Sequence, residues 1–128
     1  RGEKVLCIGD KDDHVIDCTE NRRRLDDIPT TAAIIKDAKL FIGIDSFPMH
    51  IAQTFNVPGI CFFGCVDPKL RIYSDKMKSI TAQNLACLGC HHRKPAPCTV
   101  TNNCETGTLD CVKNVSVEQM WTEILKIL

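Results

Sequence analysis

The segment from Leu40 to Pro68 constrains the fold of this chain more than any other stretch. It reads LFIGIDSFPMHIAQTFNVPGICFFGCVDP, with apolar runs at 40–44 and 59–63 on either side of an amphipathic stretch. Each run is too short for a buried helix and suits a strand that is covered on both faces. The pattern therefore predicts a strand–helix–strand unit, whose crossover in a parallel sheet should be right-handed.

Four residues predict where the helix of this unit begins and ends. Ser46 suits the N-cap, and Pro48 suits the first turn, where its missing N–H has no helical partner. Asn56 and Pro58 mark the end of the helix. Its apolar face would be formed by Met49, Ile51, Ala52 and Phe55.

The start of this helix is also the best candidate for a binding site. Open α/β sheets bind ligands beyond the carboxyl ends of their strands, and a helix N-terminus placed there attracts phosphate. Asp45 and His50 flank the helix start, so one can accept sugar hydroxyls and the other can donate to an anion. The alternative is that Ser46 only caps the helix and Asp45 only stabilises its first turn.

Residues 45–68 resemble the D-S-G-P-M-H-x-A-x-A-x-x-x-P-x-x-x-x-F-G-x-x-D-P signature of the ADP-heptose–lipopolysaccharide heptosyltransferases. Those enzymes are GT-B glycosyltransferases, built from two facing Rossmann-like halves. Phe47 departs from the pattern, because the family usually has a glycine there, which lets the backbone approach the donor diphosphate. The positions that match are Asp45, Ser46, Pro48, Met49, His50, Ala52, Pro58, Phe63, Gly64, Asp67 and Pro68.

The resemblance implies an α/β fold: a Rossmann-like parallel sheet with flanking helices, one half of a GT-B enzyme. This would be the carboxyl-terminal, donor-binding half, with the acceptor site and catalytic residues in an amino-terminal half that we do not find here. The implied reaction moves a heptose-like sugar from a nucleotide-diphosphate donor, such as ADP-heptose, to lipopolysaccharide or another lipid-linked or glycan acceptor. We expect this chain alone to be inactive. The implied donor-binding residues are Asp45, Ser46, Phe47, Met49, His50, Gly64 and Asp67.

Transfer in GT-B enzymes needs no metal or other cofactor, and the resemblance implies a cytoplasmic protein at the inner face of the membrane. The composition agrees with a small-molecule site. The formal net charge is zero and aromatic residues make up 5% of the chain, which argues against nucleic acid as a partner. No apolar run approaches the roughly 20 residues of a membrane span.

The flanking sequence predicts further elements around this unit. A helix over 30–38 should lead into the first strand, and a short strand over 78–82 should follow the second. At the amino terminus, 4–8 reads as a strand and 14–18 as a second short apolar stretch. The gap between these two is too short for a usual parallel crossover. Either a helix begins near Asp12 or the two stretches are joined irregularly, and the sequence leaves both open.

Cysteine is the second informative feature, with nine in 128 residues. Cys87 and Cys90 have the C-x2-C spacing that brings two thiolates to one tetrahedral metal. A structural zinc or iron ion would order this core-poor loop, and its candidate ligands are Cys87, Cys90, Cys98, Cys104 and Cys111. Disulfides, free thiols, covalent haem attachment through Cys87, Cys90 and His91, and a redox dithiol are the alternatives. The other four, Cys7, Cys18, Cys61 and Cys65, are expected in the core.

The chain should end in a helix. Ser116 and Gln119 form a capping box, in which Gln119 follows the cap by three residues. Its apolar positions are Val117, Met120, Trp121, Ile124, Leu125 and Leu128, and we expect Trp121 to pack rather than to bind sugar.

We expect three regions: a Rossmann-like nucleotide-sugar-binding core over 1–85, a cysteine-rich loop over 86–112, and a C-terminal helix over 113–128 packed on the core. A competing interpretation is a non-catalytic Rossmann-like binding module. In it, Phe47 blocks the diphosphate position and the cysteine loop forms a metal-ordered interaction surface.

Overall fold

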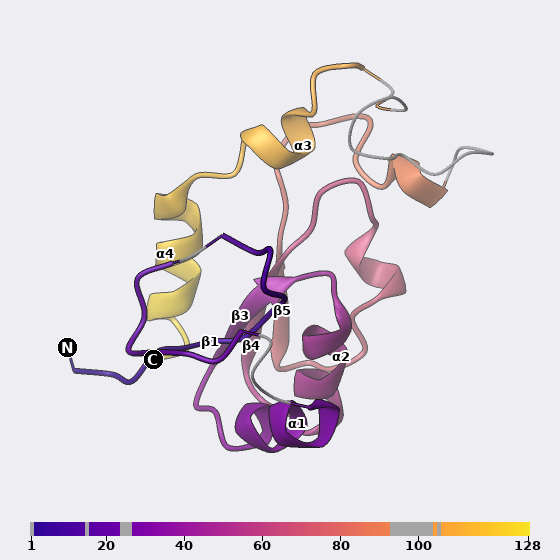
Figure 1. Cartoon of the computed structure of the whole chain (residues 1–128). Helices are drawn as coiled ribbons and strands as arrows, with labels where there is room; N and C mark the ends of the chain where they lie inside the picture. Colours follow the sequence, from indigo (N-terminus) through magenta and orange to yellow (C-terminus); the bar gives the residue numbers. More distant parts are fainter. Residues whose placement is uncertain (1, 15, 24–26, 93–103, 105) are drawn as a thin grey trace.

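The fold is known from a computed structural model of the chain (Figure 1). It describes residues 2–14, 16–23, 27–92, 104 and 106–128. The strands are β1 (Leu6–Cys7), β2 (Glu20–Asn21), β3 (Phe41–Ile44), β4 (Gly59–Phe62) and β5 (Met77–Ile80). The α-helices are α1 (Ile28–Lys36), α2 (Phe47–Thr54), α3 (Asp110–Lys113) and α4 (Val117–Leu125), and the 3₁₀ turns are η1 (Pro68–Leu70) and η2 (Cys90–His92).

The central sheet is parallel, with the strand order β3–β4–β5. Both strands predicted from the apolar runs at 40–44 and 59–63 are confirmed, as is a strand close to 78–82. Phe41 pairs with Gly59, and Ile44 pairs with Phe62. The expected α/β class is therefore confirmed, and the arrangement is compatible with a Rossmann-like half.

Helices cover the two faces of this sheet (Figure 1). On one face, Phe41 and Cys61 from the strands pack with Ile35 of α1 and Met49 of α2 in the larger buried cluster. On the other face, the buried Ile60 and Ile80 pack with Ile124 of α4. In β4, the adjacent residues Ile60 and Cys61 therefore point into different cores, which explains why that strand reads as a continuous apolar run. The expectation that both strands are covered on both faces is wrong for β3, where Ile42 and Ile44 are 50% and 59% exposed.

The helix termini follow the sequence signals, with one correction. Asp27 caps α1 by accepting a 2.8 Å hydrogen bond from the Thr30 amide, a cap that the sequence reading did not identify. Ser46 occupies the N-cap position of α2, but its hydroxyl donates to the Ile44 carbonyl at 3.3 Å and makes no capping bond. The extended backbone before α2 brings that hydroxyl back onto the strand end. Asn56, with a φ of 59°, ends the helix as predicted.

The amino-terminal strands form a separate two-stranded parallel sheet, in which Leu6 pairs with Glu20. The predicted strand at 4–8 is confirmed in shortened form, whereas strand β2 lies beyond the apolar stretch at 14–18. No helix joins the two strands among the described residues, so the irregular connection is the one observed. Two of the four cysteines expected in the core, Cys7 and Cys61, are buried, while Cys18 and Cys65 are only partly buried.

Helix α4 is confirmed, with its cap bond from the Gln119 amide to the Ser116 hydroxyl at 3.1 Å. The Gln119 side-chain nitrogen donates to the Thr81 carbonyl at 3.2 Å, and no reciprocal bond from the Ser116 amide is found among the described residues. The expectation that Trp121 packs is wrong, since it is 56% exposed. Packing selects the neighbouring stripe of Met120, Ile124 and Ile127, and the exposed apolar residues on the helix and just after it are Val117, Trp121, Leu125 and Leu128.

Among the residues that the structure describes, none of the helices has both the length and the apolar character needed to cross a membrane.

Candidate functional site

The candidate site lies where β3 ends and α2 begins. Asp45 and Ser46 form the two-residue connection between the strand and the helix. No side chain caps α2, so its first-turn N–H groups keep the character of a phosphate-binding helix N-terminus. Pro48 lies in the first turn, where it fixes the backbone without removing a helical hydrogen bond.

Asp45 has a cationic partner that the sequence reading missed. The Arg71 Nε lies 3.5 Å from the Asp45 Oδ2, with side chains 40% and 21% exposed. The pair joins the end of β3 to the residue that follows η1. Beneath it, burial and the Asp45 charge raise the pKa of the Cys61 thiol to about 12, so this thiol stays protonated.

A buried glutamine fixes the segment that carries Arg71. Gln53 of α2 is only 4% exposed, and its amide donates to the Arg71 carbonyl at 3.1 Å. Its side-chain oxygen accepts hydrogen bonds from the amides of Tyr73 and Ser74 at 2.9 and 3.2 Å. Three backbone groups of residues 71–74 are thus satisfied by one side chain, which attaches this segment to α2.

Tyr73 strengthens the same attachment on the outer side of α2. Its hydroxyl donates to the His50 carbonyl at 3.1 Å, and its ring lies parallel to the His50 imidazole, 6.4 Å away between centroids. The His50 imidazole is therefore held beside residues 71–74. The predicted site residue His50 and the missed residues Arg71, Gln53 and Tyr73 belong to one cluster around α2.

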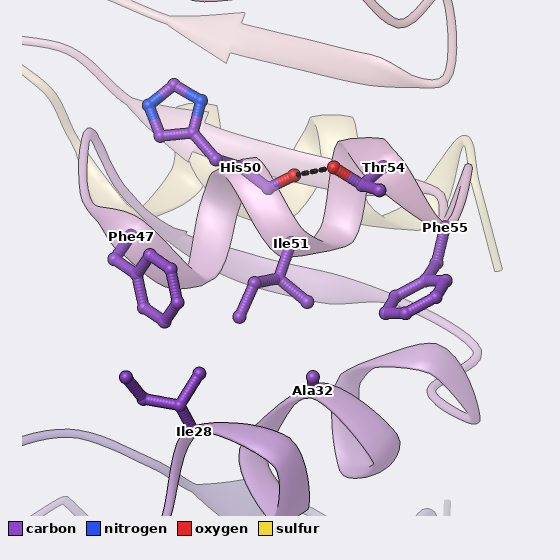
Figure 2. Close-up of a pocket in the computed structure, with 7 residues that line it drawn as sticks. All are labelled: Ile28, Ala32, Phe47, His50, Ile51, Thr54 and Phe55. Atoms are coloured by element: carbon purple, nitrogen blue, oxygen red, sulfur yellow. Dashed lines mark hydrogen bonds between the residues drawn. The ribbon is translucent and has the colours of Figure 1, made fainter.

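Phe47, Ile51 and Phe55 point away from His50, as Figure 2 shows. They face Ile28 and Ala32 of α1 across a shallow apolar pocket of about 270 Å³. Phe47 remains 53% exposed at the mouth of this pocket. Its side chain thus lies between the two helices rather than on the side of α2 that carries the His50 imidazole.

The remaining predicted donor-binding residues are spread out. Met49 is fully buried in the larger core, so it supports α2 from beneath and offers no surface to a ligand. Asp67 caps η1 by accepting a hydrogen bond from the Lys69 amide at 3.0 Å. Gly64 faces α3, because a Cβ atom there would lie 3.4 Å from Val112. The structure therefore groups Asp45, Ser46 and His50, and it places Gly64 against the cysteine-rich segment.

The cysteine-rich segment contacts the loop that carries Asp67. The His91 amide donates to the Cys65 carbonyl at 3.0 Å, and a Cβ atom at Gly89 would lie 3.3 Å from the Asp67 Cβ. Gly89 has a φ of +76°, a conformation that other residues adopt at a cost. The turn between Cys87 and Cys90 thus needs a glycine for both its backbone and its neighbour.

Replacing Gly89 with alanine should lower the free energy of unfolding by about 1–2 kcal/mol, from the left-handed backbone and the crowding against Asp67. Gly107→Ala is the matched control, because Gly107 has a similar φ of +73° and open space around it. Urea unfolding of the two variants measures the difference. An equal loss in both would mean that the Asp67 contact contributes nothing.

The predicted metal ligands are close to one another but do not form a metal site among the described residues. Burial and the nearby thiols of Cys65, Cys87, Cys90 and Cys104 raise the pKa of Cys111. No group of three or more cysteine, histidine or acidic side chains in the described part of the chain is arranged to hold an ion. The fifth candidate, Cys98, lies outside the described residues, so metal binding stays a prediction. No disulfide joins the eight described cysteines to one another, and His91 Nδ1 is buried with no partner within the described part of the chain.

A parallel sheet with an open helix N-terminus, an aspartate and a histidine at its carboxyl edge is typical of α/β proteins that bind phosphorylated ligands. The comparison with known families makes this specific. Residues 26–101 match the model of glycosyltransferase family 9 (heptosyltransferase), and the chain belongs to this family.

A single stretch also resembles lipopolysaccharide heptosyltransferase 3 of Escherichia coli. The two are 51% identical over 39 residues, which make up 30% of this chain and 12% of that enzyme. The match thus covers only a small part of the relative. No solved structure matches the chain.

Proposed function

We propose that this chain forms the carboxyl-terminal, donor-binding half of a GT-B glycosyltransferase. It would bind a nucleotide-diphosphate sugar of the ADP-heptose type, for transfer to lipopolysaccharide or another lipid-linked or glycan acceptor at the inner face of the membrane. The observation that carries the proposal is the uncapped start of α2, flanked by Asp45 and His50 at the carboxyl edge of the parallel sheet. Family membership supports the reaction class.

The chemistry follows from charge. Breaking the bond between the sugar carbon and the diphosphate oxygen leaves negative charge on the diphosphate, and oriented N–H donors stabilise it. The first turn of α2 supplies such donors, and His50 can add one more. Asp45 would accept hydrogen bonds from sugar hydroxyls. None of these steps requires a metal ion, and a metal in the cysteine-rich segment would have a structural role there.

The position of Phe47 favours this proposal over a blocked, non-catalytic binding module. Its ring points toward Ile28 of α1, whereas the His50 imidazole points to the opposite side of α2, although His50 also lines the pocket between the two helices (Figure 2). Replacing Phe47 with glycine is therefore not needed to open the diphosphate position. Clearly tighter ADP binding by Phe47→Gly would instead support the blocked module.

ADP binding tests the proposal directly. We expect the chain to bind ADP weakly, with a Kd of about 1 mM or somewhat below, because in the proposed GT-B arrangement a second half would also contribute to the site. His50→Gln should weaken this binding severalfold, as measured by NMR titration. His14→Gln is the matched control, since His14 is exposed in the connection before β2.

Two results would contradict the proposal. One is an absence of any ADP binding to the folded chain, and the other is equal weakening by His50→Gln and His14→Gln. Sugar transfer from ADP-heptose by the 128-residue chain alone would contradict the expectation that the catalytic groups lie in another half.

A further inference from the structure

Arg71 is the cationic side chain that faces Asp45 at the carboxyl edge of the sheet. Its Nε lies 3.5 Å from the Asp45 carboxylate, and both side chains are partly exposed. No other acceptor in the described part of the chain takes a hydrogen bond from the guanidinium. An exposed ion pair of this length contributes little to stability. The ion pair is therefore of interest for its position next to the start of α2, and not for its contribution to stability.

The backbone of Arg71 is fixed from two sides. Its amide donates to the Pro68 carbonyl at 3.0 Å, and its carbonyl accepts from the buried Gln53 at 3.1 Å. Tyr73, two residues later, bonds to the His50 carbonyl. These contacts tie residues 68–73 to α2, so Arg71 stays beside that helix.

The chemistry of arginine matches the ligand expected at this place. A guanidinium presents a planar fork of N–H donors that fits phosphate oxygens, and it carries a permanent positive charge. Asp45 lies one residue before the N-cap Ser46, so the guanidinium that contacts Asp45 lies close to the start of α2. Both attract negative charge.

We propose that Arg71 binds the diphosphate of the sugar donor and that Asp45 holds its guanidinium in place until the donor arrives. When the donor binds, Arg71 leaves Asp45 and donates its hydrogen bonds to the diphosphate. The Asp45 carboxylate is then free to accept hydrogen bonds from the sugar hydroxyls. The inference rests on the proposed function, because it assigns a residue to the same donor site.

The test compares ADP and adenosine binding to the whole chain by NMR titration. Arg71→Gln should weaken ADP binding about tenfold, equivalent to about 1.4 kcal/mol, and leave adenosine binding unchanged. The dependence of ADP affinity on salt should also become shallower. Arg71→Lys keeps the charge without the fork and should give an intermediate affinity. Lys69→Gln is the control, since Lys69 is an exposed cation in η1.

Each outcome decides between the proposals. Unchanged ADP affinity in Arg71→Gln, with weakening in His50→Gln, would overturn the role of Arg71 and leave the donor site in place. Equal weakening of ADP and adenosine by Arg71→Gln would also overturn it, because it would indicate a structural role. If the folded wild-type chain binds no ADP, both the assignment of Arg71 and the proposed function fail.

Discussion

Replacing Gln53 with alanine should lower the free energy of unfolding by about 3 kcal/mol. The side chain is 4% exposed and satisfies three backbone groups: the Arg71 carbonyl and the amides of Tyr73 and Ser74. Each would lose its partner in a partly buried place, at a cost of roughly 1 kcal/mol or more. The melting temperature should fall by roughly 10 °C.

Two further variants separate the hydrogen bonds from the volume of the side chain. Gln53→Met keeps most of the volume and removes all three bonds, so it should be nearly as destabilised as the alanine variant. Gln83→Ala, an exposed glutamine after β5, should change stability by less than about 0.5 kcal/mol. Near-wild-type stability of Gln53→Met in urea would show that the bonds to residues 71–74 contribute little.

The same variants bear on the binding site. Residues 71–74 carry Arg71 and Tyr73, and Gln53 is the group that fixes their backbone to α2. A folded Gln53→Met chain should therefore bind ADP more weakly than wild type, because Arg71 would no longer be held beside Asp45. That result would show that stability and ADP binding depend on the same buried amide.

The sequence predicted the strand–helix–strand unit because its signals are local. Continuous apolar runs specify strands β3 and β4, and Pro48 and Asn56 specify the bounds of α2 between them. In β4 both faces are buried, which makes its apolar run uninterrupted, whereas Ile42 and Ile44 of β3 are apolar but exposed.

The residues that complete the candidate site were not predictable, because they meet through tertiary contacts. Gln53 reads as an ordinary polar position of an amphipathic helix, and only the loop that returns from η1 buries it. Arg71 lies 26 positions after its partner Asp45, with no spacing rule that connects them. The prediction that Trp121 packs was wrong for a related reason. Two adjacent stripes of α4 are apolar, and only the stripe with Ile124 packs against the sheet.

In the metal-free chain at pH 7, we expect iodoacetamide to alkylate Cys104 at least a hundredfold faster than Cys61. Hydrogen bonds from Thr106 and the neighbouring backbone lower the pKa of Cys104 to about 7, whereas burial raises that of Cys61 to about 12. The thiolate is the nucleophile, so its fraction differs by roughly five orders of magnitude. The more acidic Cys104 thiolate is intrinsically less nucleophilic, which reduces the expected difference in rate by about two orders of magnitude.

The alkylation rates of the two cysteines should depend on pH in different ways. The Cys104 rate should rise as pH increases through about 7 and level off above it, while the Cys61 rate should still be rising at pH 9. Peptide mass spectrometry after timed alkylation measures both in one sample. Thr106→Val is the control, because it removes the hydroxyl that lies 3.6 Å from the Cys104 sulfur and should shift the Cys104 profile to higher pH.

The same measurement on the chain as purified, before any chelator, tests the metal prediction. If zinc or iron is bound by the predicted ligands, Cys87, Cys90, Cys104 and Cys111 should resist alkylation until a chelator is added, and elemental mass spectrometry should find one ion per chain. If Cys104 reacts at once and no metal is found, the segment is held by packing alone. Gly89 against Asp67 and His91 on Cys65 would then be the contacts that attach it to the sheet.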